Sequence, residues 1–270
     1  MLVDSGRSRS VCMSVYSFDD LINRREPLAP PLIHVHVQKA AGSTLNGLLM
    51  KNYKMRVDSR GVDFIPRFTK DEIITLAGPA RSEDDRVRPT FFTGHIDLDN
   101  EIFSLMPGRF VTVAVLRDPV ERVISHYRFN STQPGVFQKT ISEDGMSVLD
   151  YHEKFAGAIG TQFGVFAPNG SVSDAVRRLE HDVSLFGLSS EFEDFTTALC
   201  SLLGFETWTY KPLNRTSFDA AKVSDQEAAE LKAILADDIA FYEEAVALHN
   251  RRKEHLPSFI AQHEWTKFYS

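Results

Sequence analysis

The chain has 270 residues, of which 43% are hydrophobic and 25% are charged, a composition sufficient for one large α/β domain or two small ones. Its formal net charge of −7 argues against a general nucleic-acid-binding protein, which would be basic, and disfavours a long polyanion as a substrate.

Cysteine content and hydropathy indicate the compartment. The chain contains only Cys12 and Cys200, which are too few for a disulfide framework and lack the spacing of metal ligands, so we expect a reducing environment. No apolar run approaches the length of a membrane span, and residues 1–10 lack the hydrophobic core of a signal peptide. We therefore expect a cytoplasmic protein, although a chain trimmed of a membrane anchor would have the same features.

The N-terminal part is predicted to be an irregular arm over residues 1–31 with a short helix near residues 17–23. An apolar strand over residues 32–37 follows, and then a helix over residues 43–53. The next predicted elements, in chain order, are a helix over residues 70–76, a strand over 90–93, a helix over 98–105, a strand over 110–116 and a helix over 119–129. The strand over residues 110–116 is almost wholly apolar, as in a parallel sheet covered on both faces.

A polar loop over residues 130–145 separates these elements from the C-terminal part. There the patterns predict helices over residues 147–155 and 174–180, a strand over 183–188, a helix over 191–203, a short strand over 208–211 and a helical region over 224–253 that breaks near Asp237 and Asp238. Strands that alternate with helices indicate βαβ units. The prediction is therefore one α/β domain over residues 32–270, with three layers and a central parallel sheet flanked by helices.

Residues 38–44 (Gln-Lys-Ala-Ala-Gly-Ser-Thr) connect a strand directly to a helix. The start of a helix presents N–H groups and a partial positive charge, and so binds anions. Gly42 permits close approach of the backbone, and Lys39 adds a positive charge. In the loop of P-loop NTPases the lysine directly precedes Ser or Thr, which is not the order here. Taken alone, the segment is equally typical of a plain strand–turn–helix joint.

A second polar segment follows the predicted strand over residues 110–116. Arg117 comes directly after that strand, where ligands of open parallel sheets bind, and its guanidinium can grip a phosphate with two hydrogen bonds. Ser125 lies about two helical turns further on. Asp118 caps the helix and Pro119 takes its first position. Arg122 is interpreted either as a solvated residue or as a partner of Glu121 or Asp118.

Together the two segments resemble the sulfotransferase superfamily, and most closely its carbohydrate-type branch (family 2), which includes heparan 2-O-sulfotransferases and bacterial relatives. Lys39-x-x-Gly-Ser-Thr44 resembles the family's 5′-phosphosulfate loop, and Leu116-Arg-Asp-Pro-x-Glu-Arg-x-x-Ser-His-Tyr127 resembles its 3′-phosphate segment. Phe92-Thr-Gly-His95, Phe186-Gly-Leu-Ser-Ser-Glu-Phe192 and Asp238-Ile-x-Phe-Tyr-Glu-x-Ala245 extend the resemblance over residues 32–250. Gln38 departs from the family pattern, which has proline there.

The resemblance implies a P-loop-like sulfotransferase fold and transfer of a sulfuryl group from 3′-phosphoadenosine 5′-phosphosulfate to an acceptor hydroxyl group. It implies that the loop residues Lys39, Ala40, Ala41, Gly42, Ser43 and Thr44 bind the 5′-phosphosulfate end and that Arg117 and Ser125 bind the 3′-phosphate. Lys39 would also stabilise the leaving group. No metal ion would be required.

His95 is the candidate base, because the resemblance assigns the Gly-His segment to the active site and imidazole titrates near neutrality. The alternative for His95 is a hydrogen-bonded loop residue. His34 and His36 lie two apart on a strand, hence on one face of the sheet, and are expected to contact neighbouring strands or a covering helix. His126 is expected to be structural. Asn214 is predicted to lie either near the nucleotide or in a surface turn.

Two other functions stay open at this point. A nucleotide kinase or other P-loop NTPase would bind ATP with Mg²⁺, and a non-catalytic protein would retain the fold and bind nucleotide alone. The acceptor is expected to be a carbohydrate or a small molecule, and the sequence does not predict the oligomeric state.

Overall fold

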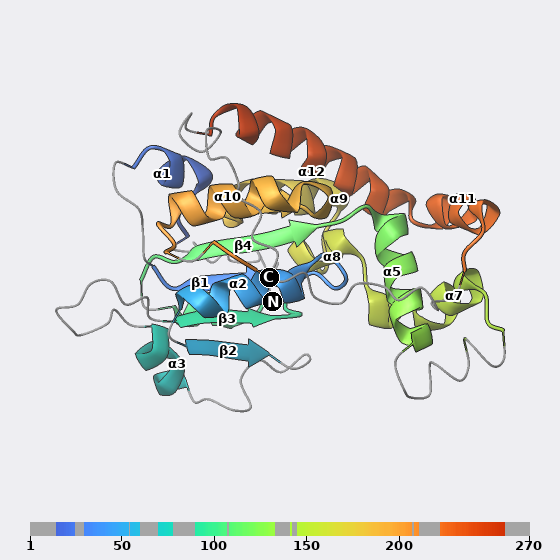
Figure 1. Cartoon of the computed structure of the whole chain (residues 1–270), viewed down its shortest axis with the longest axis horizontal. Helices are drawn as coiled ribbons and strands as arrows, with labels where there is room; N and C mark the ends of the chain where they lie inside the picture. The colour runs from blue at the N-terminus through green and yellow to red at the C-terminus, as the bar shows by residue number, and fades with distance from the viewer. Residues whose placement is uncertain are drawn as a thin grey trace, which may run out of the picture.

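The computed structural model describes residues 15–24, 30–53, 55–59, 70–77, 90–106, 108–132, 141, 145–206, 208–210 and 222–256. In the described part, five parallel strands form one sheet in the order β2-β3-β1-β4-β5. The strands are β1 (Leu32–Val35), β2 (Met55–Ser59), β3 (Thr90–Gly94), β4 (Val111–Leu116) and β5 (Leu185–Leu188). Every pair of neighbouring strands is parallel, as predicted, and the arrows of β2, β3 and β4 point the same way in Figure 1.

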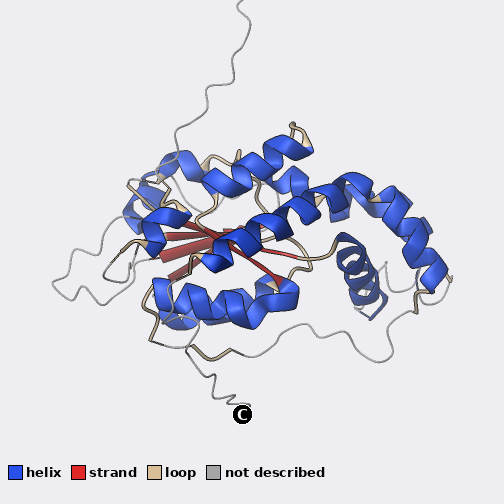
Figure 2. Cartoon of the chain, turned by 90° about the horizontal axis from the view of Figure 1, so that it is seen from above, coloured by secondary structure: helices blue, strands red, loops and turns tan. Residues whose placement is uncertain are grey.

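Helices cover both faces of this sheet, as Figure 2 shows. One face packs against α1 (Phe18–Ile22), α2 (Gly42–Asn52) and α10 (Phe192–Leu202). The other packs against α4 (Ile102–Leu105), α8 (Gln162–Phe166), α9 (Val172–Asp182) and α12 (Ala236–Glu254). Successive residues of a strand face opposite sides of the sheet, so Leu32 joins the first core and Ile33 the second. The predicted three-layer α/β domain is confirmed.

A third apolar cluster lies beyond the carboxyl ends of the strands, at the right of Figure 1. It joins α5 (Pro119–Thr132), α7 (Val148–Ile159) and α11 (Asp225–Ile234), whose buried side chains include Val123, Tyr151 and Leu231. The described part also contains α3 (Lys70–Ala77) and the 3₁₀ turn η2 (Ser189–Glu191). The bundle of α5, α7 and α11 therefore lies at the carboxyl end of the sheet.

Several predicted boundaries need correction. β2 and α8, five residues each, were not predicted. The helix expected over residues 98–105 begins only at Ile102, because residues 98–101 form turns and a bend. Residues 208–210 form no strand. The C-terminal helical region breaks at Leu235 rather than at Asp237 and Asp238.

The predicted helix near residues 17–23 is present as α1, and a capping box of Ser224 and Glu227 opens α11, where the predicted C-terminal helical region begins. Phe18 and Leu21 of α1 are buried in the same core as α2. The boundary predicted at residue 31 stays a prediction. Asn214 and most of the predicted loop over residues 130–145 lie outside the described residues.

Candidate active site

A cavity of about 600 Å³ opens at the carboxyl ends of β1, β3, β4 and β5. β1 lies in the middle of the sheet and pairs with both β3 and β4. After β1 the chain forms β2 and β3 on one side of it, and then β4 and β5 on the other side. Ligands of open α/β sheets bind at such a reversal of strand order. The predicted site residues that line the cavity are Lys39, Ala41, Gly42, Ser43, Thr44, His95, Arg117 and Ser125. Ala40 does not line it, because its side chain is buried in the core.

The loop after β1 has an unusual backbone. Lys39 and Ala41 have φ angles of 62° and 65°, in the left-handed region that residues with a Cβ rarely adopt. Each such residue costs on the order of 1 kcal/mol, and strain of this kind is concentrated at functional sites. The Thr44 and Leu45 amides both donate to the Ala41 carbonyl, so the helical hydrogen bonds begin there. The N-terminal end of α2, which attracts anions, therefore lies at this loop.

Gly42 is required by the close approach of His36. A Cβ atom on residue 42 would lie 2.0 Å from Cδ2 and 2.3 Å from Nε2 of the His36 ring. His36 lies just beyond β1, and its ring also packs against His95 with the ring centroids 4.4 Å apart. The glycine therefore makes room for a neighbouring side chain, which the sequence alone did not indicate.

We expect Gly42→Ala to destabilise the fold by about 1–3 kcal/mol, because the added methyl group must displace the His36 ring or the start of α2. Gly157 is the matched control: it lies exposed in α7 with nothing within 4 Å of its Cβ position, so Gly157→Ala should be neutral or slightly stabilising. Urea unfolding of both variants measures the difference. Equal midpoints for Gly42→Ala and the wild type would contradict this account.

Arg117 lies directly after β4 and extends toward the loop after β1. Its Nη1 donates to the Lys39 carbonyl over 3.2 Å, and its Nε donates to Oε2 of Glu121 over 3.3 Å. The Glu121 carboxylate is well exposed, so a bound phosphate can replace it as the partner of Arg117. Asp118 caps α5 as predicted, because its Oδ1 accepts the Glu121 amide over 2.9 Å.

The Lys39 side chain is held over an aromatic ring. Its Nζ lies 3.8 Å from the centre of the Phe129 ring, a cation–π contact that the sequence did not suggest. Burial, and secondarily the positive charge of Arg117, lowers the pKa of Lys39 to about 8. An anion in the cavity would oppose both effects, since it favours the charged ammonium.

His95 follows β3 in the position next to His36, because β1 and β3 are parallel neighbours and pair Val35 with Gly94. The His95 Nδ1–H donates to the His36 carbonyl over 2.7 Å. In neutral imidazole this bond fixes the proton on Nδ1 and leaves Nε2 as an acceptor. The exposed ring of His95 is thus oriented as a base would need to be.

His126 also lines the cavity, but with the opposite tautomer. Its Nδ1 lies 2.7 Å from the Tyr151 hydroxyl and 3.4 Å from Nδ2 of Asn130, which also donates to that hydroxyl over 2.6 Å. Because an amide nitrogen can only donate, Nδ1 of His126 is the acceptor. Burial, and secondarily the charge of Lys39, lowers the pKa of His126 to about 4, so the ring is neutral at pH 7. Neutral His126 therefore carries its proton on Nε2 and is a hydrogen-bond donor.

His34 has the structural role expected of it. Its Nδ1 lies 2.7 Å from Asn46 Oδ1 on α2 and 3.0 Å from Thr93 Oγ1 on β3.

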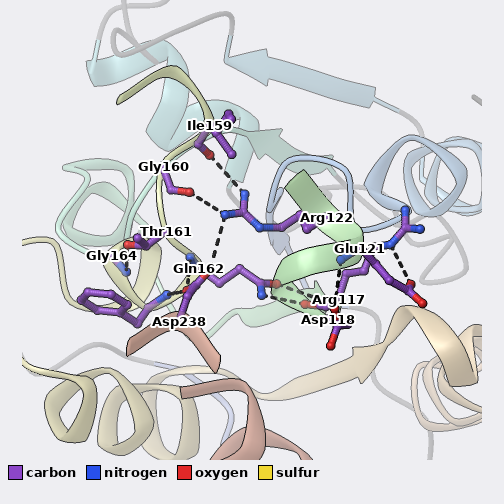
Figure 3. A network of polar contacts seen from close by, with 11 residues as sticks. Arg117, Asp118, Glu121, Arg122, Ile159, Gly160, Thr161, Gln162, Gly164 and Asp238 are labelled. Atoms are coloured by element: carbon purple, nitrogen blue, oxygen red, sulfur yellow. Dashed lines mark hydrogen bonds and ion pairs between the residues drawn. The ribbon is translucent and has the colours of Figure 1, made fainter. Parts of the chain in front are cut away.

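The prediction for Arg122 is wrong. Arg122 is almost completely buried and pairs with Asp238, with Nη2 3.4 Å from Oδ2, as Figure 3 shows. Its burial results from α7 and α12, which close over α5.

Within the described ranges, His, Cys, Asp and Glu side chains form no group of three that could hold a metal ion. The helices described here include none that is long and apolar enough to cross a membrane.

Comparison with known proteins shows that residues 29–201 match the model of the Sulfotransferase family. This range covers more than half of the chain and contains both predicted phosphate-binding segments and His95. No curated protein matches the chain.

Proposed function

Because the chain belongs to the sulfotransferase family, we propose that it transfers the sulfuryl group of 3′-phosphoadenosine 5′-phosphosulfate to the hydroxyl group of a carbohydrate or small molecule. The observation that carries this proposal is the cavity itself. It brings together Lys39 after β1, His95 after β3 and Arg117 after β4.

The donor is proposed to lie with its 5′-phosphosulfate on the loop over residues 38–44. The amides at the start of α2 and the Lys39 ammonium supply positive charge to it. Arg117 and Ser125, the latter on the same helix that begins at Pro119, are proposed to bind the 3′-phosphate. Two separate anion sites on one cavity fit a nucleotide with phosphates at both ends of the ribose.

The reaction is proposed to be an in-line displacement at sulfur. The acceptor oxygen forms a new bond to sulfur while the bond from sulfur to the 5′-phosphate oxygen breaks, and the nucleotide leaves as 3′,5′-bisphosphate. The acceptor proton goes to Nε2 of His95, which its bond to the His36 carbonyl orients. The Lys39 ammonium stabilises the charge that develops on the leaving oxygen. His126, which also lines the cavity, is proposed to donate its Nε2–H to a sulfuryl oxygen.

Binding of adenosine 3′,5′-bisphosphate, measured by calorimetry, tests the proposed donor. We expect Arg117→Ala to weaken this binding on the order of 100-fold, because it removes charge-assisted hydrogen bonds to a phosphate. Arg177 is the matched control, since it lies exposed on α9 in an ion pair with Asp174. Equal affinities in the wild type and Arg117→Ala would contradict the assignment. Nucleotide binding without sulfate transfer to any hydroxyl acceptor of a broad panel would favour a non-catalytic protein.

A further inference from the structure

The side chain of Gln162, which is completely buried, is paired with the backbone of Arg117. Gln162 Oε1 accepts the Arg117 amide over 3.0 Å, and Gln162 Nε2 donates to the Arg117 carbonyl over 2.7 Å (Figure 3). β4 ends at Leu116, one residue before Arg117, and the last residue of β4 pairs with Leu188 of β5. The carboxamide of Gln162 therefore satisfies both backbone groups of Arg117 just where the sheet no longer does.

Gln162 is in turn fixed by Asp238, which lies on α12. The Asp238 Oδ1 accepts the amide of Gln162 over 2.6 Å and that of Phe163 over 3.1 Å. These are amides of the first turn of α8, which the helix itself cannot satisfy. Asp238 thus caps α8 from a helix 76 residues further along the chain, while Thr161 caps it locally through the Gly164 amide.

Arg122 completes the network. It reaches Asp238 from α5 and also donates to the carbonyls of Ile159, over 3.1 Å, and Gly160, over 2.5 Å, at the end of α7. α5, α7, α8 and α12 therefore meet behind Arg117, as Figure 3 shows. Among the residues that the structure describes, the Arg117 guanidinium bonds to the Lys39 carbonyl and to exposed Glu121, so its position depends strongly on its backbone.

We propose that Gln162 is a positioning residue for Arg117, and that Asp238 holds it in place from a helix outside the range matched by the family model. The proposal rests on the proposed function, in which Arg117 binds the 3′-phosphate. Gln162 does not touch the nucleotide. It restricts the Arg117 backbone, so that the guanidinium is already aimed at the 3′-phosphate before binding.

The test compares the affinities of two nucleotides, adenosine 3′,5′-bisphosphate and adenosine 5′-phosphate, by calorimetry. Gln162→Met keeps the length and volume of the side chain but removes both hydrogen bonds to Arg117. We expect it to lower the preference for the bisphosphate about tenfold, with the affinity for adenosine 5′-phosphate unchanged. A merely destabilised protein would lose affinity for both nucleotides together. Gln226→Met is the matched control, because Gln226 lies exposed on α11 and its side chain donates to Glu230 on the same helix.

A second variant and a second measurement protect the test against misfolding of Gln162→Met. Gln162→Glu retains the acceptor for the Arg117 amide but, when ionised, cannot donate to its carbonyl, so its preference for the bisphosphate should also fall. Hydrogen exchange on the wild type should find the Arg117 amide protected, and rapid exchange would overturn the proposal. A folded Gln162→Met with wild-type preference would overturn it while leaving the proposed function intact. A wild type without any preference, unaffected by Arg117→Ala, would overturn both.

Discussion

Replacing His95 with asparagine is expected to lower kcat by about 10²- to 10⁴-fold, because the acceptor hydroxyl loses the base that removes its proton. The Nδ1–H of His95 is committed to the His36 carbonyl, which leaves Nε2 free of a proton in the neutral ring. Asparagine is a poor base at any accessible pH but is similar in size. The measurement is single-turnover transfer of labelled sulfate to whichever sugar or phenol the wild type uses best.

Nucleotide binding separates a catalytic role of His95 from a structural one. We expect His95→Asn to bind adenosine 3′,5′-bisphosphate as the wild type does, because the predicted donor contacts come from the loop over residues 38–44 and from Arg117. His181→Asn on α9 is the matched control for loss of an exposed imidazole. A decrease in kcat of less than tenfold would exclude His95 as the base. Loss of nucleotide binding would indicate that its bond to His36 mainly supports the loop.

The parts of the site that could be predicted from the sequence are those whose positions depend on a local pattern of apolar residues. A run of apolar residues defines each central strand, and the residue after the strand must lie at the carboxyl edge of the sheet. His95 and Arg117 directly follow β3 and β4, and Lys39 lies in the short loop between β1 and α2. The register of parallel strands then brings them together, since Val35 pairs with Gly94 and with Ala114. Their convergence on one cavity could therefore be predicted without any knowledge of side-chain contacts.

The residues behind the site could not be predicted in this way. Gln162 opens a helix of five residues, too short for a helical pattern to emerge, and its partner Arg117 is 45 residues away. Arg122 was interpreted as a solvated residue or as a partner of the nearby Glu121 or Asp118, whereas its partner, Asp238, lies 116 residues further on. β2 has a mixed sequence, Met-Arg-Val-Asp-Ser, without the apolar run that identifies the central strands.

The loop after β1 shows a second limit of sequence patterns. Nothing in the sequence of residues 38–42 favours left-handed backbone at Lys39 and Ala41, and glycine would be the usual choice there. Residue 38 is glutamine, so this chain forms its turn without the fixed φ angle that a proline would supply at that position. The conformation must therefore be imposed by packing, in which Ala40 is buried and the His36 ring closes on Gly42.

Arg122→Met is expected to destabilise the protein by about 3–5 kcal/mol, because it leaves the buried Asp238 carboxylate without its ionic partner. The substitution also removes the donors to the Ile159 and Gly160 carbonyls at the end of α7. Urea unfolding at pH 7 measures the loss. Arg177→Met is the matched control, since the exposed pair of Arg177 with Asp174 should contribute less than about 0.5 kcal/mol.

The pH dependence of this loss identifies the buried charge as its cause. Burial already raises the pKa of Asp238, and Arg122 opposes that rise, so the pKa must increase further in Arg122→Met. A carboxyl group whose pKa is higher in the folded state than in the unfolded state favours folding when protonated, and this contribution is lost as the pH rises through the folded-state pKa. The deficit of Arg122→Met relative to the wild type should therefore shrink between pH 7 and pH 5. An equal deficit at both pH values would assign the loss to the missing carbonyl contacts instead.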